Sequence, residues 1–544
     1  MQPARNPSPT PDPAASSHPD VLSGSAVAGG QPLSGSPLRV GSQPLSGGHP
    51  GAGTAEGSGP ASPSATSRQA EESTLKLEGA RVTVMGLGLN GGGVATARFL
   101  ASRGALVTVT DMKDEAALVD SVRSLDGLGI RFVLGRHDEA DFSSADFVVK
   151  NPAVRPDNAF LKLARQVETD LSLFLRLCPA RIAAVTGSKG KSTPATALAW
   201  RLGQAGFGVH LGGNITVSPL SFVDEIKADD IVVLELSSWQ LGDLKGRGLL
   251  KPFVSIITRI VPDHLDRYGT MDRYVADKRL IYADQGPEDW TVLDLDDPWG
   301  RLFASETRAG ILAYATDLDA AIAGAGLPAA PEASVHAGIA VPSDGSPCLA
   351  RLQDGATVEL VPQRLLVPGG HTRRNLAAAA MAAWACGAAP SRIAAAAASF
   401  AGVEHRLEPV RERRGVRWYN DSAATVPEAV AAAVESFTEP VVLITGGTDK
   451  VLDFSVARDA YRKAAAIVLL AGTGTDKFMH IRESAGIPWQ GPFNDIVQAI
   501  ASADSLARPD TVVVLSPGCT SFGMFKNEFD RGRSYKRAVM ELPG

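Results

Sequence analysis

Short, continuously apolar runs alternate with alanine-rich stretches from about Leu75 onwards, and this alternation limits the possible fold more than any other feature. A strand that is apolar at every position has both faces covered, as parallel strands between two layers of helices have. The sequence therefore predicts an α/β fold with parallel sheets. The runs expected to be strands are Arg81–Met85, Ala105–Thr110, Asp146–Val149, Ile182–Val185, Ile231–Leu236, Val254–Thr258, Val441–Thr445, Ala466–Leu470 and Thr511–Leu515.

The spacing of these runs predicts three domains. They fall into three groups, separated near Cys178 and near Gly402. A chain of 544 residues is long enough for this, since one domain takes roughly 100–200 residues. We expect three consecutive α/β domains: a Rossmann-like domain at 74–177, a P-loop ATPase domain at 178–402 and a second Rossmann-like domain at 403–544.

The first 73 residues differ in composition from the remainder. Of the first 70 residues, 36 are Gly, Pro or Ser, and large apolar side chains are few. Such a segment buries too little apolar surface to offset its conformational entropy, so we expect 1–73 to be a disordered tail. A linker or interaction tail and a start codon assigned too far upstream both fit this composition, and the sequence leaves both open.

Composition also excludes several classes of protein. The net charge is −6, with 53 Lys and Arg against 59 Asp and Glu, and no strongly basic run is present, so nucleic acid is not an expected partner. No apolar run of about 18 residues and no signal-peptide pattern occur, so we expect a cytoplasmic protein without membrane insertion. Neither a disulfide framework nor a zinc ribbon is indicated, because the cysteines lie far apart at Cys178, Cys348, Cys386 and Cys519.

The strongest local motif is the stretch Thr186–Thr193, which reads TGSKGKST and follows the expected strand Ile182–Val185. Glycines in such a loop let backbone N–H groups surround phosphate oxygens, and the N-terminus of the following helix adds positive potential. A lysine in the position of Lys191 reaches the β- and γ-phosphates, and the next hydroxyl meets Mg²⁺. We therefore expect ATP to bind at Gly187, Ser188, Lys189, Gly190, Lys191, Ser192 and Thr193.

Three further polar residues follow expected strands of the same domain. Glu235 ends the run that begins at Ile231, and in a parallel sheet that end faces the ligand crevice, which makes Glu235 a candidate Mg²⁺ ligand. His264 follows the next strand, and Lys278 lies beyond it on an expected helix. Taken singly, these residues are more typical of a helix cap or surface charge, a structural histidine and a solvated lysine. Their order along the chain is what indicates a function.

This order of motifs resembles the Mur ligase family, the ATP-dependent enzymes that build the peptide stem of peptidoglycan, and most of all its MurD-like branch. The similarity covers about Leu75 to Gly544. The motifs that carry it are Gly86–Gly91, Thr186–Thr193, Gly213–Ile215, Glu235–Leu241, Pro262–Asp266, Lys278, His371 to Asn375, His405–Glu408, Asn420–Ser422, Gly446 and Gly447 with Lys450, and Leu515–Pro517 with Cys519.

The resemblance implies a role for each domain. The first domain would hold the UDP part of a nucleotide substrate, the central one ATP, and the last one the incoming amino acid. The residues implied for the UDP substrate are Gly86, Gly88, Asn90, Gly91, Asp111 and Asn214. Those implied for ATP, besides the loop, are Asn375, Arg406 and Asp421, and those for the amino acid are Thr425, Lys450 and Ser521.

The resemblance also implies a metal-dependent centre. Ser192 and Glu235 would hold one Mg²⁺ and His264 a second, and Lys278 matches a lysine that the family carries as a carbamate. With Lys191, the expected catalytic residues are thus Glu235, His264 and Lys278, and the expected cofactors are ATP and Mg²⁺.

The implied reaction adds D-glutamate to UDP-N-acetylmuramoyl-L-alanine, on a monomeric enzyme. The substrate carboxylate attacks the γ-phosphate of ATP, and the amine of the amino acid then attacks the acyl phosphate, giving an amide, ADP and phosphate. Positioning and electrostatics supply most of the catalysis, because no Ser-His-Asp or Cys-His arrangement is recognisable. Cys519 is accordingly expected to be a packed thiol rather than a nucleophile.

Some positions depart from the family pattern. Arg259 and Thr372 stand where the family usually has asparagines, and Ala423 stands where MurD-like enzymes have a lysine near the incoming glutamate. An aromatic residue that the family has further downstream is displaced in this chain, where the sequence reads Glu528 and Phe529. L-glutamate therefore stays open as an alternative acceptor.

Other functions fit single motifs. The glycines of Gly86–Gly91 alone suggest a nicotinamide-dependent dehydrogenase, but an ATP loop in the next domain disfavours it. A folylpolyglutamate synthase shares the ATP loop but lacks a separate N-terminal UDP domain. A non-catalytic nucleotide switch would not need Glu235, His264 and Lys278 together.

Overall fold

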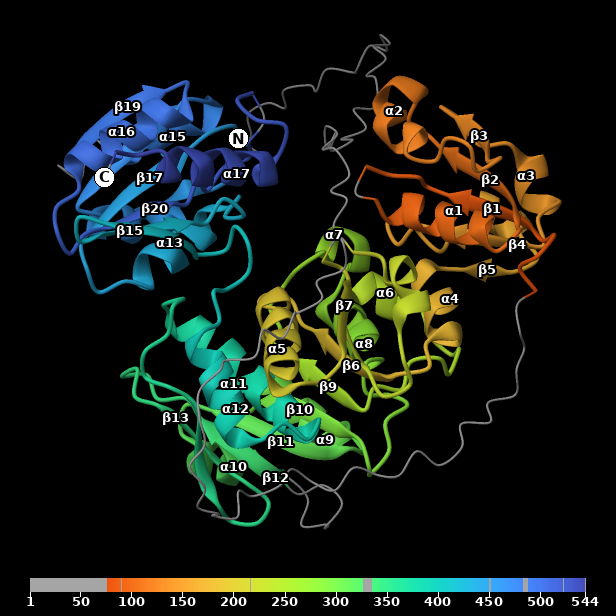
Figure 1. The fold of residues 1–544 in the computed structure, drawn as a ribbon, viewed down its shortest axis with the longest axis horizontal. Helices are drawn as coiled ribbons and strands as arrows, with labels where there is room; N and C mark the ends of the chain where they lie inside the picture. The colour runs from red at the N-terminus through yellow and green to blue at the C-terminus, as the bar shows by residue number, and fades with distance from the viewer. Residues whose placement is uncertain are drawn as a thin grey trace, which may run out of the picture.

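The computed structural model describes residues 76–89, 91–215, 217–325, 335–449, 452–482, 488–521 and 523–543. In this part of the chain the strands form three sheets, one after another along the sequence (Figure 1). Each strand that the sequence predicted is present within one residue at either end, and the prediction of three α/β units is confirmed. Among the described residues, no helix combines the length and the apolar character needed to cross a bilayer.

The first sheet is parallel throughout, with the strand order β3-β2-β1-β4-β5. Its strands are β1 (Arg81–Met85), β2 (Leu106–Asp111), β3 (Arg131–Leu134), β4 (Phe147–Lys150) and β5 (Val167–Glu168). The helices around it are α1 (Gly92–Ser102), α2 (Glu115–Arg123), α3 (Glu139–Ser143) and α4 (Asp170–Leu177), with a 3₁₀ turn η1 (Phe160–Leu163).

The second sheet has the order β14-β13-β12-β11-β10-β9-β6-β8-β7, antiparallel only at its β12-β13-β14 end. Its strands are β6 (Arg181–Thr186), β7 (Val209–Gly213), β8 (Ile231–Glu235), β9 (Val254–Ile257), β10 (Trp290–Asp294), β11 (Gly310–Ala315), β12 (Val335–Ala340), β13 (Cys348–Arg351) and β14 (Thr357–Val361). Its helices are α5 (Ser192–Ala205), α6 (Ser238–Asp243), α7 (Leu265–Tyr268), α8 (Met271–Arg279), α9 (Pro298–Glu306), α10 (Leu318–Gly324), α11 (Gly370–Ala385) and α12 (Pro390–Ala398), with 3₁₀ turns η2 (Pro219–Ser221) and η3 (Val223–Glu225).

The third sheet has the order β15-β16-β20-β17-β18-β19 and is parallel except for the edge pair β15-β16. Its strands are β15 (Glu408–Arg413), β16 (Val416–Asn420), β17 (Val441–Gly446), β18 (Ala466–Leu470), β19 (Trp489–Phe493) and β20 (Val512–Leu515). Its helices are α13 (Pro427–Glu435), α14 (Arg458–Lys463), α15 (Thr473–Arg482), α16 (Ile496–Leu506) and α17 (Glu528–Met540), with a 3₁₀ turn η5 (Phe454–Ala457).

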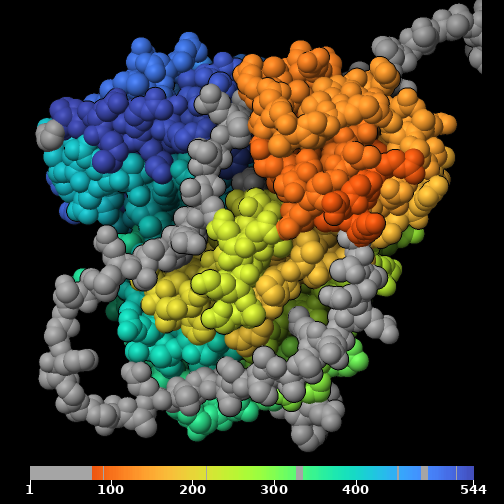
Figure 2. Space-filling view, turned by 45° about the vertical axis from the view of Figure 1, so that its right-hand side comes forward, coloured from red at the N-terminus to blue at the C-terminus, as the bar shows by residue number. Residues whose placement is uncertain are grey.

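The first and second domains share an apolar core, which contains Val82 and Phe99 from one and Phe222 and Val232 from the other. A buried ion pair joins the same two domains, from Lys150 Nζ at the end of β4 to an oxygen of Asp243 on α6 at 2.6 Å, with each side chain only 4% exposed. The last domain contacts the central one through the loop before α11, where Val367 packs in the apolar core of the last domain. Figure 2 shows that the first (orange) and last (blue) domains both lie against the central domain.

Helix α1 packs unusually close to the turn that precedes it. A Cβ atom on Gly93 would lie 2.3 Å from the Leu87 carbonyl oxygen and 2.5 Å from that of Gly86. Only a residue without a side chain permits this approach. The adjacent Gly92 has no heavy atom within 4 Å of a Cβ position, so the two glycines differ in their packing alone.

We therefore predict that Gly93→Ala lowers the free energy of unfolding of the first domain by about 1–3 kcal/mol, because the methyl group must displace backbone atoms. Gly92→Ala is the matched control and should leave that stability unchanged or slightly raised. Calorimetric unfolding of the two variants checks this, and equal midpoints would contradict it.

Candidate functional site

The candidate site lies at the carboxyl end of β6, which runs between β8 and β9. Val185 pairs with Glu235 on one side, and Thr186 pairs with Ile257 on the other. The loop from Gly187 to Lys191 follows β6 and leads into α5. Parallel pairing therefore brings the loop, the end of β8 and the segment after β9 to one edge of the sheet, as the sequence predicted.

The loop is held against the segment after β9 by a close backbone contact. A Cβ atom on Gly187, at φ 148°, would lie 1.8 Å from the Thr258 hydroxyl oxygen. That hydroxyl donates to the Lys189 carbonyl oxygen at 2.8 Å. Thr258 was not among the predicted site residues. The sequence predicted only that Thr258 ends a strand, and it gave no indication that the hydroxyl contacts the loop.

Ser188 ties the loop to α8 and to the segment after β9. Its hydroxyl donates to the Val261 carbonyl oxygen at 2.9 Å and accepts from the Tyr274 hydroxyl at 2.9 Å. Its backbone N–H donates to the carbonyl oxygen of Arg259 at 3.0 Å. Arg259 makes this contact through its backbone carbonyl, so the replacement of the usual asparagine by arginine at this position leaves the contact unchanged.

Lys191 carries a partly buried ammonium whose Nζ donates to the Ser188 carbonyl oxygen at 3.1 Å. Burial is the main cause that lowers the pKa of this group. The carboxylates of Glu235 and Asp263 oppose the shift, whereas the charges of Lys189 and Arg406 add to it. Lys189, by contrast, is exposed and pairs with Asp263 at 3.2 Å.

Glu235 has one carboxylate oxygen without a hydrogen-bond partner among the described residues, beside the loop. Its side chain is 2% exposed, and Oε1 accepts from the Asn214 amide at 3.1 Å. Oε2 is buried and has no hydrogen-bond partner among the described residues. A buried carboxylate oxygen without a donor carries a desolvation cost that a cation would remove, so Glu235 fits the donor chemistry of Mg²⁺. Asn214 lies against Glu235, in the central domain.

Lys278 is buried in the middle of the site, with 1% of its side chain exposed. Its Nζ donates to the Gly187 carbonyl oxygen at 2.8 Å and lies 4.7 Å from the centre of the Tyr274 ring. Burial, and then the charge of Lys191, lowers the pKa of Lys278 to about 7. A surface lysine would not behave in this way, so the amine is available in its neutral form near neutral pH.

His264 and Ser192 border the same space. His264 is the N-cap residue of α7, in a left-handed conformation (φ 52°), and its exposed ring lies 5.0 Å from that of Trp239 and 6.4 Å from that of Tyr274. Ser192 is the first residue of α5, directly after Lys191. Both side chains are thus at the edge of the sheet that carries Glu235.

Helix α11 brings Asn375 to the phosphate loop. A Cβ atom on Gly190 would lie 3.2 Å from the amide oxygen of Asn375. Thr372, one of the departures from the family pattern, is buried and donates its hydroxyl to the Pro368 carbonyl oxygen at 2.9 Å, so it ties the start of α11 to the segment before it.

In the last domain, Asp421 lies in the core behind Arg406. Its carboxylate accepts from the backbone N–H of Leu407 at 3.2 Å and from the hydroxyl of Ser516 at 2.9 Å. Burial raises the pKa of Asp421 to about 7, against the effect of those two donors and of the Arg406 charge. The Arg406 side chain itself is exposed.

In the first domain, Asp111 closes the glycine turn. Its carboxylate accepts from the backbone N–H of Gly88 at 3.0 Å and from that of Lys113 at 2.9 Å. Gly86, Gly88 and Gly91 all have positive φ, at 96°, 65° and 83°, which explains the choice of glycine. The expected residue Asn90 lies outside the described residues.

The residues expected to meet the amino acid are partly described. Thr425 is half-buried and Ser521 is buried, both on loops of the third sheet, while Lys450 lies outside the described residues. Burial raises the pKa of the Cys519 thiol to about 12, in agreement with its expected role as a packed thiol.

Arg531 on α17 is a residue that sequence reasoning missed. It is 1% exposed and donates to the Ser422 hydroxyl at 3.0 Å, to the Ser422 carbonyl at 2.8 Å and to the Cys519 carbonyl at 3.2 Å. Burial lowers the pKa of its guanidinium to about 10. It lies in a charged helical stretch, where the sequence gives no sign that one arginine is buried.

Three family models match the chain in order. They are the Mur ligase MurD-like N-terminal domain at residues 80–171, the Mur ligase middle domain at 185–383 and the Mur ligase glutamate ligase domain at 405–519. Similar curated proteins from Roseiflexus sp. (42% identical) and Treponema pallidum (39% identical) are both named UDP-N-acetylmuramoylalanine–D-glutamate ligase. Each alignment covers 86% of this chain and 99% of the relative.

Solved structures agree on the fold. The UDP-N-acetylmuramate-alanine ligase MurC from Thermotoga maritima is 18% identical with a TM-score of 0.54, over 85% of this chain and all of that one. The MurF ligase from Thermotoga maritima, in complex with ADP, is 16% identical with a TM-score of 0.50, over 80% and 96% of the two chains. Together with the long matches to curated relatives at 39% and 42% identity, the ordered domain models show that the chain belongs to the Mur ligase family, as the resemblance predicted.

Proposed function

We propose that the protein is an ATP-dependent, ADP-forming ligase that joins D-glutamate to the alanyl carboxylate of UDP-N-acetylmuramoyl-L-alanine during peptidoglycan precursor synthesis. The observation that carries the proposal is the arrangement at the end of β6, where a phosphate loop, the buried lysine Lys278 and the vacant oxygen of Glu235 lie together. The names and lengths of the curated relatives support the substrates. A monomeric, cytoplasmic enzyme is part of the proposal.

The three domains divide the work in this proposal. The glycine turn of the first domain, closed by Asp111, receives the UDP moiety. The loop Gly187–Thr193 and Asn375 receive ATP, with Arg406 and Asp421 approaching from the last domain. Thr425, Lys450 and Ser521 meet the amino acid, and we propose the boundaries 74–177, 178–402 and 403–544 for these units.

The chemistry proceeds in two steps. The alanyl carboxylate attacks the γ-phosphorus of ATP, which forms the acyl phosphate and releases ADP. The free amine of glutamate then attacks the acyl carbon, phosphate leaves, and the amine loses a proton. Lys191 lies where negative charge gathers on the transferred phosphoryl group, and its desolvated ammonium stabilises that charge more strongly than it would in water.

The residues present fit Mg²⁺. Ser192 and Glu235 would hold one ion, and His264 with Lys278 in its carbamate form would hold the second. The ion supplies neutralisation of phosphate charge when bound. Glu235 is fixed for this by the Asn214 amide at one oxygen, while the other oxygen is left without a donor among the described residues.

The test of the proposed function is a coupled assay of ADP release with UDP-N-acetylmuramoyl-L-alanine and a panel of amino acids that includes both glutamate enantiomers. We expect turnover to require the nucleotide substrate and to be fastest with D-glutamate. The preference for D-glutamate needs this test because Ala423 cannot supply the cation found in other MurD-like enzymes. Faster turnover with L-glutamate would contradict the proposed stereochemistry of the amino acid but not the ligation itself. ATP turnover without either substrate would contradict ligation.

Lys191→Ala should lower turnover by at least about a hundredfold with the fold intact, since one preorganised charge in a dry site contributes roughly 3 kcal/mol. Lys189→Ala serves as the comparison in the same loop and should cost less than about tenfold, because that ammonium is exposed and screened by water. Steady-state kinetics measure both. Near-normal rates for Lys191→Ala would remove the loop from the mechanism.

Lys278 is proposed to carry a carbamate. A neutral amine attacks CO₂, forms the N–C bond and loses one proton, so the reaction needs the uncharged lysine. Burial lowers the pKa of Lys278 to about 7, so the neutral amine predominates above that pH and disappears below it. The adduct would turn a buried cation into an anion beside Glu235.

With ¹³C-labelled bicarbonate, the protein should show one carbamate carbon by ¹³C NMR above pH 7, fading as the pH falls below 7. Lys278→Arg keeps the positive charge and prevents the adduct, so the signal and most of the ligase activity should be lost together. A wild-type spectrum without the signal, or full activity in Lys278→Arg, would count against the carbamate.

A further inference from the structure

The turn that presents Arg406 is locally strained. His405 and Leu407, on either side of Arg406, both adopt positive φ, at 64° and 43°. Non-glycine residues in that region are energetically unfavourable and persist only where surrounding contacts hold them. The contacts that hold this turn therefore determine where the exposed Arg406 side chain points.

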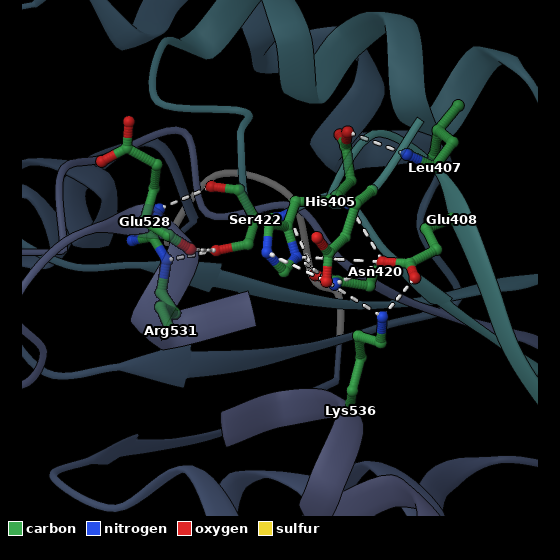
Figure 3. A network of polar contacts seen from close by, with 10 residues as sticks. His405, Leu407, Glu408, Asn420, Ser422, Glu528, Arg531 and Lys536 are labelled. Carbon is green, nitrogen blue, oxygen red and sulfur yellow. Dashed lines mark hydrogen bonds and ion pairs between the residues drawn. The ribbon is translucent and has the colours of Figure 1, made fainter. Parts of the chain in front are cut away.

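Part of the support comes from the neighbouring strands. The backbone N–H of His405 donates to Glu408 Oε2 at 3.0 Å, and the Asn420 amide donates to the same oxygen at 3.0 Å (Figure 3). The Asn420 amide also lies 2.7 Å from His405 Nδ1. Asp421 holds the far side of the turn through the Leu407 N–H at 3.2 Å.

The remaining support comes from α17, which is more than a hundred residues away in the sequence. Lys536 Nζ lies 2.5 Å from Glu408 Oε1 (Figure 3). It also lies 3.2 Å from Glu404 Oε1, so its ammonium joins the two carboxylates that flank the turn. One helical turn earlier, a Cβ atom on Gly532 would lie 2.2 Å from His405 Nδ1. The buried His405 ring therefore packs directly on the backbone of α17.

The first turn of α17 contacts the segment that leads to Thr425. The Ser422 hydroxyl donates to the Glu528 carbonyl oxygen at 2.7 Å, and Arg531 holds both the hydroxyl and the carbonyl of Ser422 (Figure 3). Ser422 precedes Thr425, a residue proposed to meet the amino acid. One rigid helix thus contacts both the segment for the amino acid and the turn of Arg406.

Glu404, His405 and Glu408 also offer donor atoms close enough for a metal ion. The contacts disfavour that reading, because Glu408 already accepts from Lys536 at one oxygen and from Asn420 at the other. The cation between the two glutamates is the Lys536 ammonium.

We propose that Lys536 and Gly532 are positioning residues for the ligation: through Glu408 and His405 they hold the strained turn so that Arg406 faces the phosphate loop, and α17 thereby couples the amino-acid end of the domain to the ATP end. The proposal rests on the proposed function for the identity of the two ends. The influence of the Arg406 charge on Lys191 is consistent with its facing the loop.

The test uses the full chain with Lys536→Met, which removes the ammonium and keeps a long side chain. The KM for ATP should rise about tenfold and kcat should fall, because a charge-assisted contact that holds Arg406 is lost, while the KM for the UDP substrate stays unchanged. Lys536→Arg should restore most of the loss. Arg537→Met, an exposed cation one position further along α17, is the matched control and should match the wild type.

Calorimetric titration with ADP gives a readout that does not depend on activity, and Lys536→Met should bind ADP about tenfold more weakly with an unchanged thermal midpoint. Should Lys536→Met fail to fold, Glu408→Gln breaks the same ion pair from the other side. Wild-type ADP affinity and wild-type KM for ATP in these variants would overturn the proposal, as would a thermal midpoint raised by added Zn²⁺, which would indicate a metal site. A wild-type protein without ligase activity would instead refute the proposed function. In that case the ADP titration would still test whether Lys536 positions Arg406.

Discussion

The contact between Gly187 and Thr258 is the constraint on which the rest of the site depends. Strand β6 lies between two parallel neighbours, so whatever follows it must pass over the ends of both. The loop does so with its backbone pressed onto the Thr258 hydroxyl, at a distance that no side chain on Gly187 would allow. This approach sets the position of Lys191 at the start of α5 and leaves the Gly187 carbonyl facing Lys278.

In this arrangement, the buried amine of Lys278, the partly buried amine of Lys191 and the unpaired carboxylate oxygen of Glu235 lie close enough to influence each other. Burial and the Lys191 charge lower the pKa of Lys278 to about 7, so the site does not carry two full positive charges at rest. Such a site suits negatively charged groups, which agrees with the phosphate and the Lys278 adduct that we propose. An electrostatic arrangement fixed before substrate arrives is what makes such charges effective, since no reorganisation is needed during the reaction.

The last domain positions its proposed site residue, Arg406, in a different way. Its sheet supplies a rigid base, but Arg406 stands on a turn whose conformation the local sequence disfavours. Contacts from β16, β15 and α17 together hold this turn. Strain that is held by surrounding structure can be released by a small movement of one of those elements, and α17 contacts both this turn and Ser422.

Much of the fold was predictable from the sequence. The continuously apolar strands, such as Ile231–Glu235, and the loop Thr186–Thr193 were recognised correctly because burial on both faces leaves a local pattern. Other strands were missed, for more than one reason. β11 reads GILAYA, which suits a helix equally well, and the edge strand β15 reads EPVRER, where charge hides the strand pattern.

The sequence by itself determined the order of the domains, the position of the phosphate loop and the family, because these depend on residue types that are adjacent in the chain. Only the tertiary structure decided which side chains are desolvated and which are in contact. The burial of Lys278, the vacant Oε2 of Glu235 and the link from Lys536 to the turn of Arg406 arise from residues tens to more than a hundred positions apart. A local sequence pattern carries no information about such distant partners, and the pKa and the conformation of these groups depend on those partners.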